Sequence, residues 1–526
     1  MTVQSTVLGF PRIGANRELK KATEAFWAGK INESALLATG KQLRIDHWKA
    51  QKAQGVDVVA AGDFSFYDQI LDHAVMFNVI PKRYEGYELT PLETYFAMGR
   101  GLQRPATETS KAVDVVACEM VKWFDSNYHN IRPEFSHSTE FKLNNTKPLD
   151  EFVEAKENGV TTRPVVIGPV SFLYLGKAAH DSPDLKPLSL LEKLLPVYKQ
   201  LLKKLADAGV EWVQIDEPIL AYDLQEEVKK EFKAAYDYLA TVDSRLKFLF
   251  TTYFGSIAHN LDIISSGLNI QGLHVDLVRA PEQLDQVIAA IGPKTVLSVG
   301  VVDGRNIWKS NLKNAISLVE RAVEKLGKDR VFVASSSSLL HTPYSIANEN
   351  KLPAEVKNWF SFAIEKCREL AVIASAINNG PESVQEFLDD NAKAIESRRT
   401  SHLTNDPEVK KRFESIKADL LKRKSEYPTR KEAQIEKLHL PLFPTTTIGS
   451  FPQTKEIRLA RSKFGKKEIT AEQYEKFIEK EIEQMIKFQD EVGLDVYVHG
   501  EPERNDMVPN HKRLLANDRS NTSVND

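Results

Sequence analysis

Cysteine is scarce in this chain of 526 residues, which contains only Cys118 and Cys367. Two cysteines are too few for the disulfide framework of a small secreted domain, and this scarcity favours a reducing compartment. No apolar run approaches the ~20 residues of a membrane span, and the first residues lack the basic and apolar regions of a signal peptide. We therefore expect a soluble, cytoplasmic protein with no membrane partner.

The chain also has no excess of charge of one sign. Its 70 basic and 73 acidic residues give a net charge of −3, whereas nucleic-acid-binding domains are typically basic. We therefore expect no nucleic-acid partner. The length exceeds the roughly 100–200 residues of one domain, which indicates more than one hydrophobic core.

Short apolar runs alternate with amphipathic stretches between about residues 160 and 345. Strands that alternate with helices are typical of parallel βαβ units, and the number of units favours a TIM-type (β/α)8 barrel. Leu190–Ala208 and Asn311–Leu326 are two of the predicted helices. The predicted strands are Pro164–Gly168, Trp212–Asp216, Phe248–Tyr253, Leu273–Asp276, Val296–Gly300 and Val331–Ala334.

Polar residues follow several of the predicted strands. In barrels of this type the chemistry lies at the C-terminal ends of strands, where Asp216, Glu217, Asp276, Asp303 and His341 are expected. They are either vestiges of a duplicated site or ordinary polar residues at the ends of strands. We favour the second interpretation.

The sequence contains an internal repeat. Glu18–Asp68 aligns without a gap to Glu456–Asp506, and eleven of the 51 aligned positions are identical, against roughly three expected by chance. Similar turns, Gly9–Pro11 and Gly449–Pro452, precede the two copies. The repeat indicates two related barrels in tandem.

The second copy is predicted to be short. Strands are expected at Pro444–Ile448 and Leu494–Val498, with a helix between them that Thr470 begins and Gly493 ends. Two strands of eight do not close a barrel, so we expect the second barrel to be incomplete. The predicted organisation is a first barrel at 1–380, a charged helical linker at 381–435, the first two βα units of a second barrel at 436–508, and an aperiodic, disordered tail at 509–526.

Four segments carry a resemblance to a known family. They are Gly9–Lys21, Trp123–His129, Thr445–Pro452 and His499–Asp506. Together they are similar, in order and spacing, to the cobalamin-independent methionine synthases, over about residues 5–508. The resemblance implies two tandem barrels and methyl transfer from 5-methyltetrahydropteroyltri-L-glutamate to L-homocysteine, which gives L-methionine.

The resemblance implies a homocysteine site in the second copy. Ile448, Gly449 and Ser450 would form the turn that binds the amino-acid carboxylate, because free backbone N–H groups at such a turn bind anions. Glu501 would accept the substrate ammonium. The alternatives are a plain tight turn and a structural ion pair between Glu501 and Arg504.

The resemblance also implies a folate site in the first barrel. Arg17, Glu18, Leu19 and Lys20 match the folate-binding segment of the family, and Lys20 would meet the polyglutamate tail. A cation suits that role because the triglutamate is a polyanion. The alternative for Lys20 is a solvated helix lysine. Two further folate-binding candidates are Lys122 and Asn127.

The family uses zinc, and no cobalamin, to bind the substrate sulfur as a thiolate. The resemblance places the zinc ligands, a His, two Cys and a Glu, late in the second barrel, beyond the end of this chain. We therefore expect no metal ligands and no identifiable catalytic residue here. Cys118 and Cys367 are expected to be packed core thiols.

Two functions are compatible with these expectations. The chain is either a homocysteine S-methyltransferase in shortened form, with little activity alone, or a non-catalytic folate-binding remnant. A thiol–cobamide methyltransferase is a third and weaker alternative, because the duplicated architecture argues against it. We expect small-molecule partners only, 5-methyltetrahydropteroyltriglutamate and homocysteine, and a monomeric protein.

Overall fold

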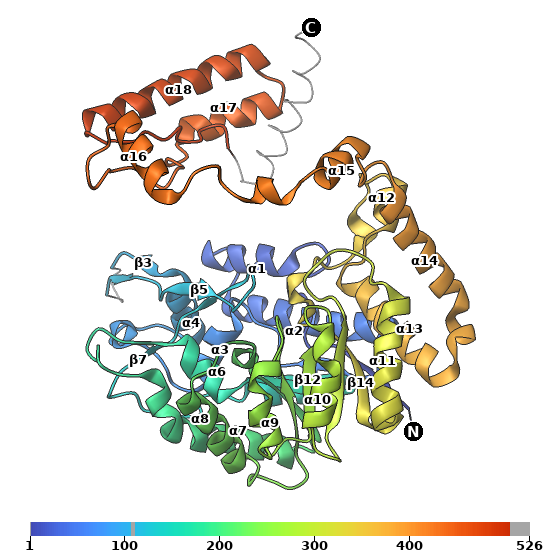
Figure 1. The fold of residues 1–526 in the computed structure, drawn as a ribbon. Helices are drawn as coiled ribbons and strands as arrows, with labels where there is room; N and C mark the ends of the chain where they lie inside the picture. Colours follow the sequence, from blue (N-terminus) through green and yellow to red (C-terminus); the bar gives the residue numbers. More distant parts are fainter. Residues whose placement is uncertain (1, 107–110, 505–526) are drawn as a thin grey trace. The chain divides into compact units, whose positions relative to one another are not determined.

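The structure is a computed structural model that describes residues 2–106 and 111–504. The chain divides into two compact units, Met1–Asp406 and Pro407–Asp526 (Figure 1).

Eight parallel strands form the central sheet of the first unit, in the order β1-β14-β13-β12-β11-β10-β8-β2. All six runs predicted as strands lie in this sheet. The strands are β1 (Gln4–Thr6), β2 (Val59–Ala61), β8 (Thr162–Ile167), β10 (Trp212–Asp216), β11 (Lys247–Thr251), β12 (Gly272–Asp276), β13 (Val296–Val302) and β14 (Val331–Ser335).

The two edges of this sheet approach each other. Thr6 and Val58 form a parallel bridge between β1 and the start of β2. The amide of Val58 donates to the carbonyl of Ser5 at 3.1 Å, and the amide of Val7 donates to the carbonyl of Val58 at 3.2 Å. The sheet is therefore a nearly closed eight-stranded barrel, as the sequence predicted for the first domain.

Helices surround the barrel (Figure 1). In α7, leucines recur at three- and four-residue steps, and Leu194, Leu201 and Leu205 are fully buried. This apolar face packs the helix onto the core. The helices are α1 (Glu18–Trp27), α2 (Glu33–Ala53), α6 (Pro169–Leu175), α7 (Leu191–Asp207), α8 (Glu226–Leu239), α9 (Leu261–Ser265), α10 (Leu284–Ala290), α11 (Leu312–Leu326), α12 (Ala354–Asn358), α13 (Ala363–Asn379) and α14 (Gln385–Thr400).

A long insertion separates β2 from β8. It contains two antiparallel hairpins, β3–β4 and β5–β6, and a strand, β7, that pairs with β9. These short strands are not among the strands predicted from the sequence. The elements are α3 (Gln69–Met76), α4 (Pro91–Arg100), β3 (Leu102–Arg104), β4 (Val113–Val115), β5 (Met120–Lys122), β6 (His129–Ile131), β7 (Glu134–Phe135) and α5 (Lys147–Glu157), with β9 (Lys177–Ala178) after β8.

The described part of the second unit is helical, with α15 (Pro407–Glu414), α16 (Tyr427–Leu438), α17 (Lys455–Gly465) and α18 (Ala471–Glu491). The predicted capping box is confirmed, because the side chains of Thr470 and Gln473 each accept from the other's backbone amide. Gly493 follows α18 with φ of 72°, which suits a glycine at a helix end.

The two strands predicted in the second copy are wrong. Pro444–Ile448 and Leu494–Val498 contain no strand, although the amide of Val496 donates to the carbonyl of Thr445 at 3.1 Å. In the first unit, β1 and β2 each have a second neighbour, β14 and β8. Among residues 407–504 no further strand lies beside these segments, so the ladder does not extend. The residues beyond 504, including the predicted tail, lie outside the described part of the chain.

The internal repeat is nevertheless visible in local geometry. The helix α18 begins and ends at the positions that the alignment pairs with the ends of α2. In the first copy, Asp57 accepts hydrogen bonds from the amide and hydroxyl of Ser5, both at 2.8 Å. In the second, Asp495 accepts the same two bonds from Thr445, at 2.7 and 2.8 Å. The repeated residues therefore make the same contacts in both units.

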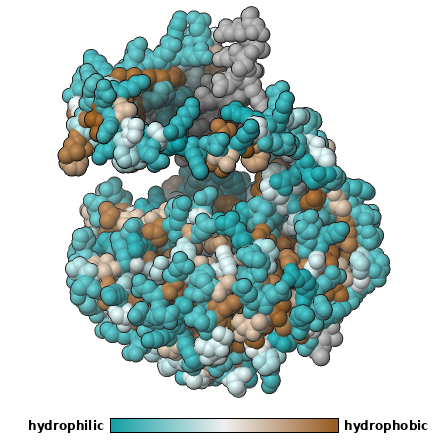
Figure 2. All heavy atoms as spheres, in the orientation of Figure 1, coloured by the Kyte–Doolittle hydropathy of each residue, from teal (hydrophilic) through white to brown (hydrophobic). Residues whose placement is uncertain are grey.

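Hydrophilic side chains cover most of the face of the molecule in Figure 2. Within residues 2–106 and 111–504, no helix has both the length and the apolar character needed to cross a bilayer.

Candidate functional site

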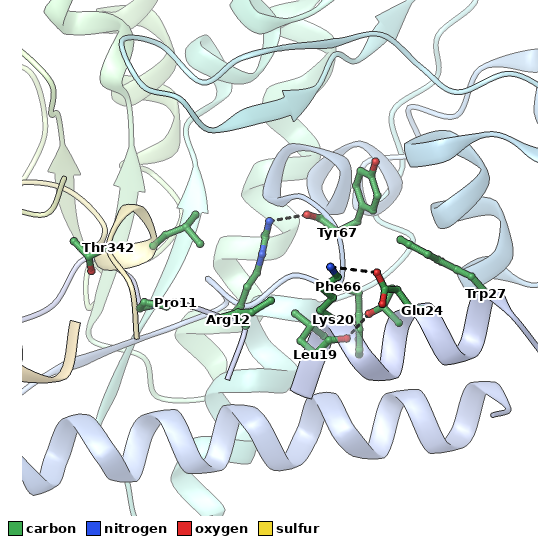
Figure 3. A pocket seen from close by; sticks show the side chains of 12 residues that line it. Pro11, Arg12, Leu19, Lys20, Glu24, Trp27, Phe66, Tyr67 and Thr342 are labelled. Carbon is green, nitrogen blue, oxygen red and sulfur yellow. Dashed lines mark hydrogen bonds and ion pairs between the residues drawn. The ribbon is translucent and has the colours of Figure 1, made fainter. Parts of the chain in front are cut away.

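A pocket of about 410 Å³ lies beside α1. Loops that follow β1, β2 and β14 form its walls together with α1, so it lies at the C-terminal ends of barrel strands, where such folds bind substrates. Figure 3 shows this pocket. Its lining residues are Pro11, Arg12, Ile13, Leu19, Lys20, Thr23, Glu24, Trp27, Phe66, Tyr67, Leu340 and Thr342.

Two of the four residues in the predicted folate-binding segment line this pocket. Lys20 is half-exposed on its wall, and its ammonium lies 3.5 Å from Glu24 (Figure 3). Leu19 is buried against Leu43 and Phe64, which fixes the start of α1 against α2. The pocket therefore presents a cation on a helix that apolar packing holds in place.

The other two residues of the segment shape the start of α1. Arg17 is exposed and precedes the helix in the left-handed region, with φ of 64°. The carboxylate of Glu18 accepts from the amide of Asn16 at 2.9 Å. Burial alone would raise the pKa of Glu18, but the hydrogen bonds from its own backbone and from Asn16 lower it. Neither residue belongs to the pocket lining.

Lys122 and Asn127 lie on the β5–β6 hairpin, and neither lines the pocket. Lys122 is exposed at the end of β5, where it pairs with His129 of β6. Asn127 is exposed in the turn, and its carbonyl lies 3.0 Å from Nδ1 of His129. The structure therefore does not bring these two candidates together with Lys20.

Arg12 is a pocket residue that is not among the site residues predicted from the sequence. Its guanidinium donates to the carbonyl of Tyr67 at 2.6 Å and to the hydroxyl of Tyr128 at 2.9 Å. That hydroxyl donates in turn to Asp68 at 2.9 Å. Burial would lower the pKa of Arg12, but the nearby Tyr128 and Asp68 raise it. Arg12 therefore stays charged and joins the hairpin to the pocket.

The pocket can bind a planar, anionic molecule. Trp27, Phe66 and Tyr67 supply aromatic surface, and the guanidinium of Arg100 lies 4.5 Å from the centre of the Trp27 ring. Two buried donors, Nη1 of Arg12 and Nε1 of Trp27, have no hydrogen-bond partner among the described residues. Buried donors without partners favour a ligand that can accept hydrogen bonds.

Glu217 and Asp216, at the end of β10, are bound by local donors. Glu217 accepts from the amide of Ser171 at 2.7 Å and the hydroxyl of Tyr236 at 2.8 Å. Asp216 accepts from the hydroxyl of Tyr253 at 3.0 Å. Burial raises the pKa of each carboxyl to about 7. These contacts fix neighbouring elements to the strand end.

The carboxylates after β12 and β13 hold loop backbone. Asp276 accepts from the amides of Phe254 and Arg279 at 3.1 and 2.9 Å, and burial raises its pKa to about 6. Asp303 accepts from the amide of Arg305 at 2.8 Å. Burial lowers the pKa of His341 to about 4. All of these contacts are compatible with a structural role.

In the second unit, two of the predicted homocysteine-binding residues lie together. The hydroxyl of Ser450 donates to Glu501 at 2.9 Å, and Arg504 forms an ion pair with the same carboxylate. The hydrogen bond from Ser450 and the charge of Arg504 lower the pKa of Glu501, so it is ionised at neutral pH. The ion pair with Arg504 that the sequence left open is present.

The turn before Ser450 is open. Ile448 is fully exposed, and Gly449 has φ of 145°, a conformation that other residues rarely adopt. Exposed backbone at this turn lies next to the Glu501 carboxylate. The turn and the Glu501 carboxylate therefore lie side by side.

The described residues do not fit a zinc site. Residues 2–106 and 111–504 contain no group of three or more His, Cys, Asp and Glu side chains placed to hold a metal ion. The Cys118 thiol is buried and accepts from Arg83 at 3.1 Å. The Cys367 thiol is buried in α13, and burial raises its pKa.

Comparison with known proteins gives two family matches. Residues 4–327 match the model described as "Cobalamin-independent synthase, N-terminal domain". Residues 443–520 match the model described as "Cobalamin-independent synthase, Catalytic domain". The two matches correspond to one region in each of the two compact units.

Similar curated proteins include the 5-methyltetrahydropteroyltriglutamate–homocysteine methyltransferases of Saccharomyces cerevisiae and Candida albicans. The chain is 58% identical to the first over 506 residues and to the second over 509. Each alignment covers 96% of this chain and 66% of the relative. The protein of the same name from Caulobacter vibrioides is 48% identical over 527 residues, with 98% and 67% covered. The chain thus spans about 66% of the length of the two fungal relatives.

Proposed function

The chain belongs to the cobalamin-independent methionine synthase family, and we propose that it serves methyl transfer from 5-methyltetrahydropteroyltriglutamate to homocysteine. The observation that carries the proposal is the 58% identity to the Saccharomyces cerevisiae methyltransferase over 96% of the chain. In this proposal the first unit binds the folate and the second binds homocysteine.

The pocket beside α1 is the proposed folate site. A polyglutamylated folate combines a flat ring system with a chain of carboxylates. Trp27 and Tyr67 offer aromatic surface to the flat part, and Lys20 offers its ammonium to the carboxylates. Arg12, which is held by Tyr67 and Tyr128, adds a second fixed charge. Arg17, Glu18, Lys122 and Asn127 do not line the pocket, so their proposed contact with folate is with parts of the ligand outside it.

The turn at Ile448–Ser450 and the Glu501 carboxylate are the proposed homocysteine site. The backbone amides of the turn would bind the carboxylate of the amino acid, and Glu501 would bind its ammonium. Glu501 already forms an ion pair with Arg504. The substrate ammonium would therefore either bind beside Arg504 or take its place on the carboxylate. The zinc that the family resemblance implies has no fitting residues in the described part of the chain, so we assign no step of the reaction to it.

Calorimetric titration with folates of different tail length tests the folate site. The Lys20→Ala variant is expected to bind 5-methyltetrahydropteroyltriglutamate about two- to fivefold more weakly than the unmodified chain, because Lys20 is half-exposed and an exposed ion pair with the ligand contributes only about 0.2–1 kcal/mol. Its affinity for the monoglutamate form is expected to stay the same. The matched control is Lys21→Ala, since Lys21 is the exposed neighbour on α1 and does not line the pocket.

Two outcomes would contradict this assignment: equal loss of triglutamate affinity in both variants, or equal loss for both tail lengths in Lys20→Ala. Methionine formation by the same preparation separates the methyltransferase from the non-catalytic folate-binding protein. Turnover would support the methyltransferase, whereas folate binding without turnover would favour a non-catalytic folate-binding protein.

A further inference from the structure

Tyr128 lies outside the pocket beside α1 but contacts one of the residues in its wall. It stands in the turn of the β5–β6 hairpin, directly before β6, and is not a lining residue. Its hydroxyl accepts from Nη2 of Arg12 at 2.9 Å, and Arg12 does line the pocket. The contact therefore links a hairpin of the insertion to a charged group of the pocket wall.

The Arg12 guanidinium is held through one of its nitrogens. Nη2 donates both to the hydroxyl of Tyr128 and to the carbonyl of Tyr67 at 2.6 Å (Figure 3). The guanidinium carbon also lies 5.4 Å from the centre of the Tyr128 ring, where a cation is attracted to the ring. A free arginine side chain samples many rotamers, so these contacts decide where its charge lies.

A buried carboxylate sets the direction of the hydrogen bond between Arg12 and Tyr128. The hydroxyl of Tyr128 donates its proton to Oδ1 of Asp68 at 2.9 Å. Burial raises the pKa of Tyr128, so the hydroxyl keeps that proton at neutral pH. An ionised carboxylate can only accept hydrogen bonds. The oxygen of Tyr128 is therefore left to accept from Arg12.

Asp68 is itself fixed by the backbone. Its Oδ2 accepts from the amide of Leu71, in the first turn of α3, at 2.8 Å and from the amide of Ile131, the last residue of β6, at 3.0 Å. Burial raises the pKa of Asp68 to about 6, although the two amides and the charge of Arg12 oppose the rise. The carboxylate is thus ionised at neutral pH and anchored to two elements of the insertion.

From this chain of hydrogen bonds we propose that Tyr128 is a positioning residue of the folate site. Its hydroxyl, which Asp68 orients, holds the Arg12 guanidinium on the pocket wall, where the charge attracts the carboxylates of the ligand. Tyr128 acts through Arg12 and needs no contact of its own with folate. The inference rests on the proposed folate site and extends that site to the β5–β6 hairpin.

Calorimetric titration of the full chain with 5-methyltetrahydropteroyltriglutamate tests the inference. Tyr128→Phe removes the hydroxyl and keeps the ring, which packs against the ring of His341 with 6.1 Å between the centroids. It should weaken binding about three- to tenfold, at the lower end of the coupling between side chains in one network. The matched control is Tyr84→Phe, which should leave the affinity unchanged. Tyr84 is a buried tyrosine of the same insertion, and its hydroxyl donates to the carbonyl of Val116 at 2.6 Å.

Arg12→Met separates positioning from a general effect on the hairpin. This variant lacks the guanidinium, so adding Tyr128→Phe to it should cause no further loss of folate affinity. A tyrosine that only stabilised the hairpin would weaken binding by the same factor with Arg12 or without it.

Nuclear magnetic resonance of the ligand-free chain, labelled with 15N-arginine, gives a readout that does not depend on folate. The Arg12 signals are those that the Arg12→Met variant lacks. Because Nη2 makes two hydrogen bonds, rotation of the guanidinium is hindered, and separate signals are expected for its two Nη groups. In Tyr128→Phe these signals should merge.

Four results would overturn the inference. These are unchanged folate affinity in Tyr128→Phe, the same loss in Tyr84→Phe, the same loss in the Arg12→Met background, and a freely rotating Arg12 guanidinium in the unmodified chain. A different result would overturn the proposed folate site alone. If the unmodified chain bound no folate while the Arg12 signals behaved as expected, the ligand assignment would be wrong and the positioning of Arg12 by Tyr128 would stand.

Discussion

Replacing Tyr236 by Phe tests how the barrel holds a buried carboxylate. Tyr236 and Glu217 are both fully buried, and the hydroxyl donates to Oε1 of Glu217 at 2.8 Å. The substitution removes one oxygen atom and leaves the packed ring in place. The loss of stability should therefore report the hydrogen bond rather than a cavity.

The effect should depend on pH. Burial raises the pKa of Glu217 from 4.5 to about 7, and the hydrogen bond from Tyr236 opposes that rise. Between pH 4.5 and 7 the native state thus binds more protons than the unfolded chain, so stability falls as the pH rises. Without the hydroxyl, the pKa of Glu217 in the native state rises further, so the stability continues to fall up to a higher pH. We expect a cost of roughly 1.5–3 kcal/mol at pH 8.5, with Glu217 ionised, and of roughly 0.5–1.5 kcal/mol at pH 5.5.

Urea unfolding followed by tryptophan fluorescence is the assay. All six tryptophans lie in the first unit, so the signal reports on the barrel alone. Tyr238→Phe is the matched control, because Tyr238 lies on the same helix and is 38% exposed. It should change the stability by less than about 0.5 kcal/mol. An equal loss for Tyr236→Phe at both pH values would refute the reasoning.

Three further substitutions test other parts of the structure. Leu201→Ala removes a fully buried side chain of α7 and should cost about 2–5 kcal/mol in the same unfolding assay. Thr470→Ala removes the cap of α18 and should weaken its first turn by about 1 kcal/mol, which hydrogen exchange of residues 471–475 would show as faster uptake. Glu501→Gln should weaken homocysteine binding and leave folate affinity unchanged in calorimetry, whereas unchanged homocysteine affinity would argue against the proposed ammonium site.

The sequence predicted the middle of the barrel better than its beginning. Runs such as Trp212–Asp216 and Val331–Ser335 are buried almost throughout, so composition alone indicates strands. The strand β1 contains only Gln4–Thr6, and all three residues are polar. It pairs with β14, which lies more than 300 residues further along the sequence. Such a strand exists because the closed sheet supplies its partners, and no local pattern indicates it.

The site residues likewise divide into those that a local sequence pattern indicates and those that depend on distant contacts. Lys20 could be selected because a resemblance marks its segment. The contact of Arg12 with Tyr128 joins residues 116 positions apart, and the hairpin that carries Tyr128 has strands of three residues. Neither periodicity nor composition indicates such a contact. The strands predicted at Pro444–Ile448 and Leu494–Val498 failed for the opposite reason, since their residues suit strands but lack neighbours in the described structure.

The internal repeat also reveals one position at which equivalent carboxylates have different hydrogen-bond partners in the two units. The internal repeat pairs Asp63 with Glu501. In the first unit, the amide of Phe10 donates to the Asp63 carboxylate at 2.8 Å, which commits the carboxylate to holding the loop after β1. In the second, the equivalent amide, that of Phe451, donates instead to the carbonyl of Gly500 at 2.8 Å.

The replacement of a side-chain acceptor by a backbone acceptor changes what the carboxylate can do. The Glu501 carboxylate does not accept from that backbone amide, and its partners among residues 2–106 and 111–504 are side-chain groups, the hydroxyl of Ser450 and the guanidinium of Arg504. Exchanging such partners for a ligand costs less than breaking a buried contact with backbone. Asp63→Asn should therefore destabilise the first unit, by about 1–3 kcal/mol in the tryptophan assay, whereas Glu501→Gln should leave the unfolding of its own unit nearly unchanged. If hydrogen exchange showed that Glu501→Gln opens α17 and α18 widely, Glu501 would be a structural residue like its counterpart, and its assignment to ligand binding would be wrong.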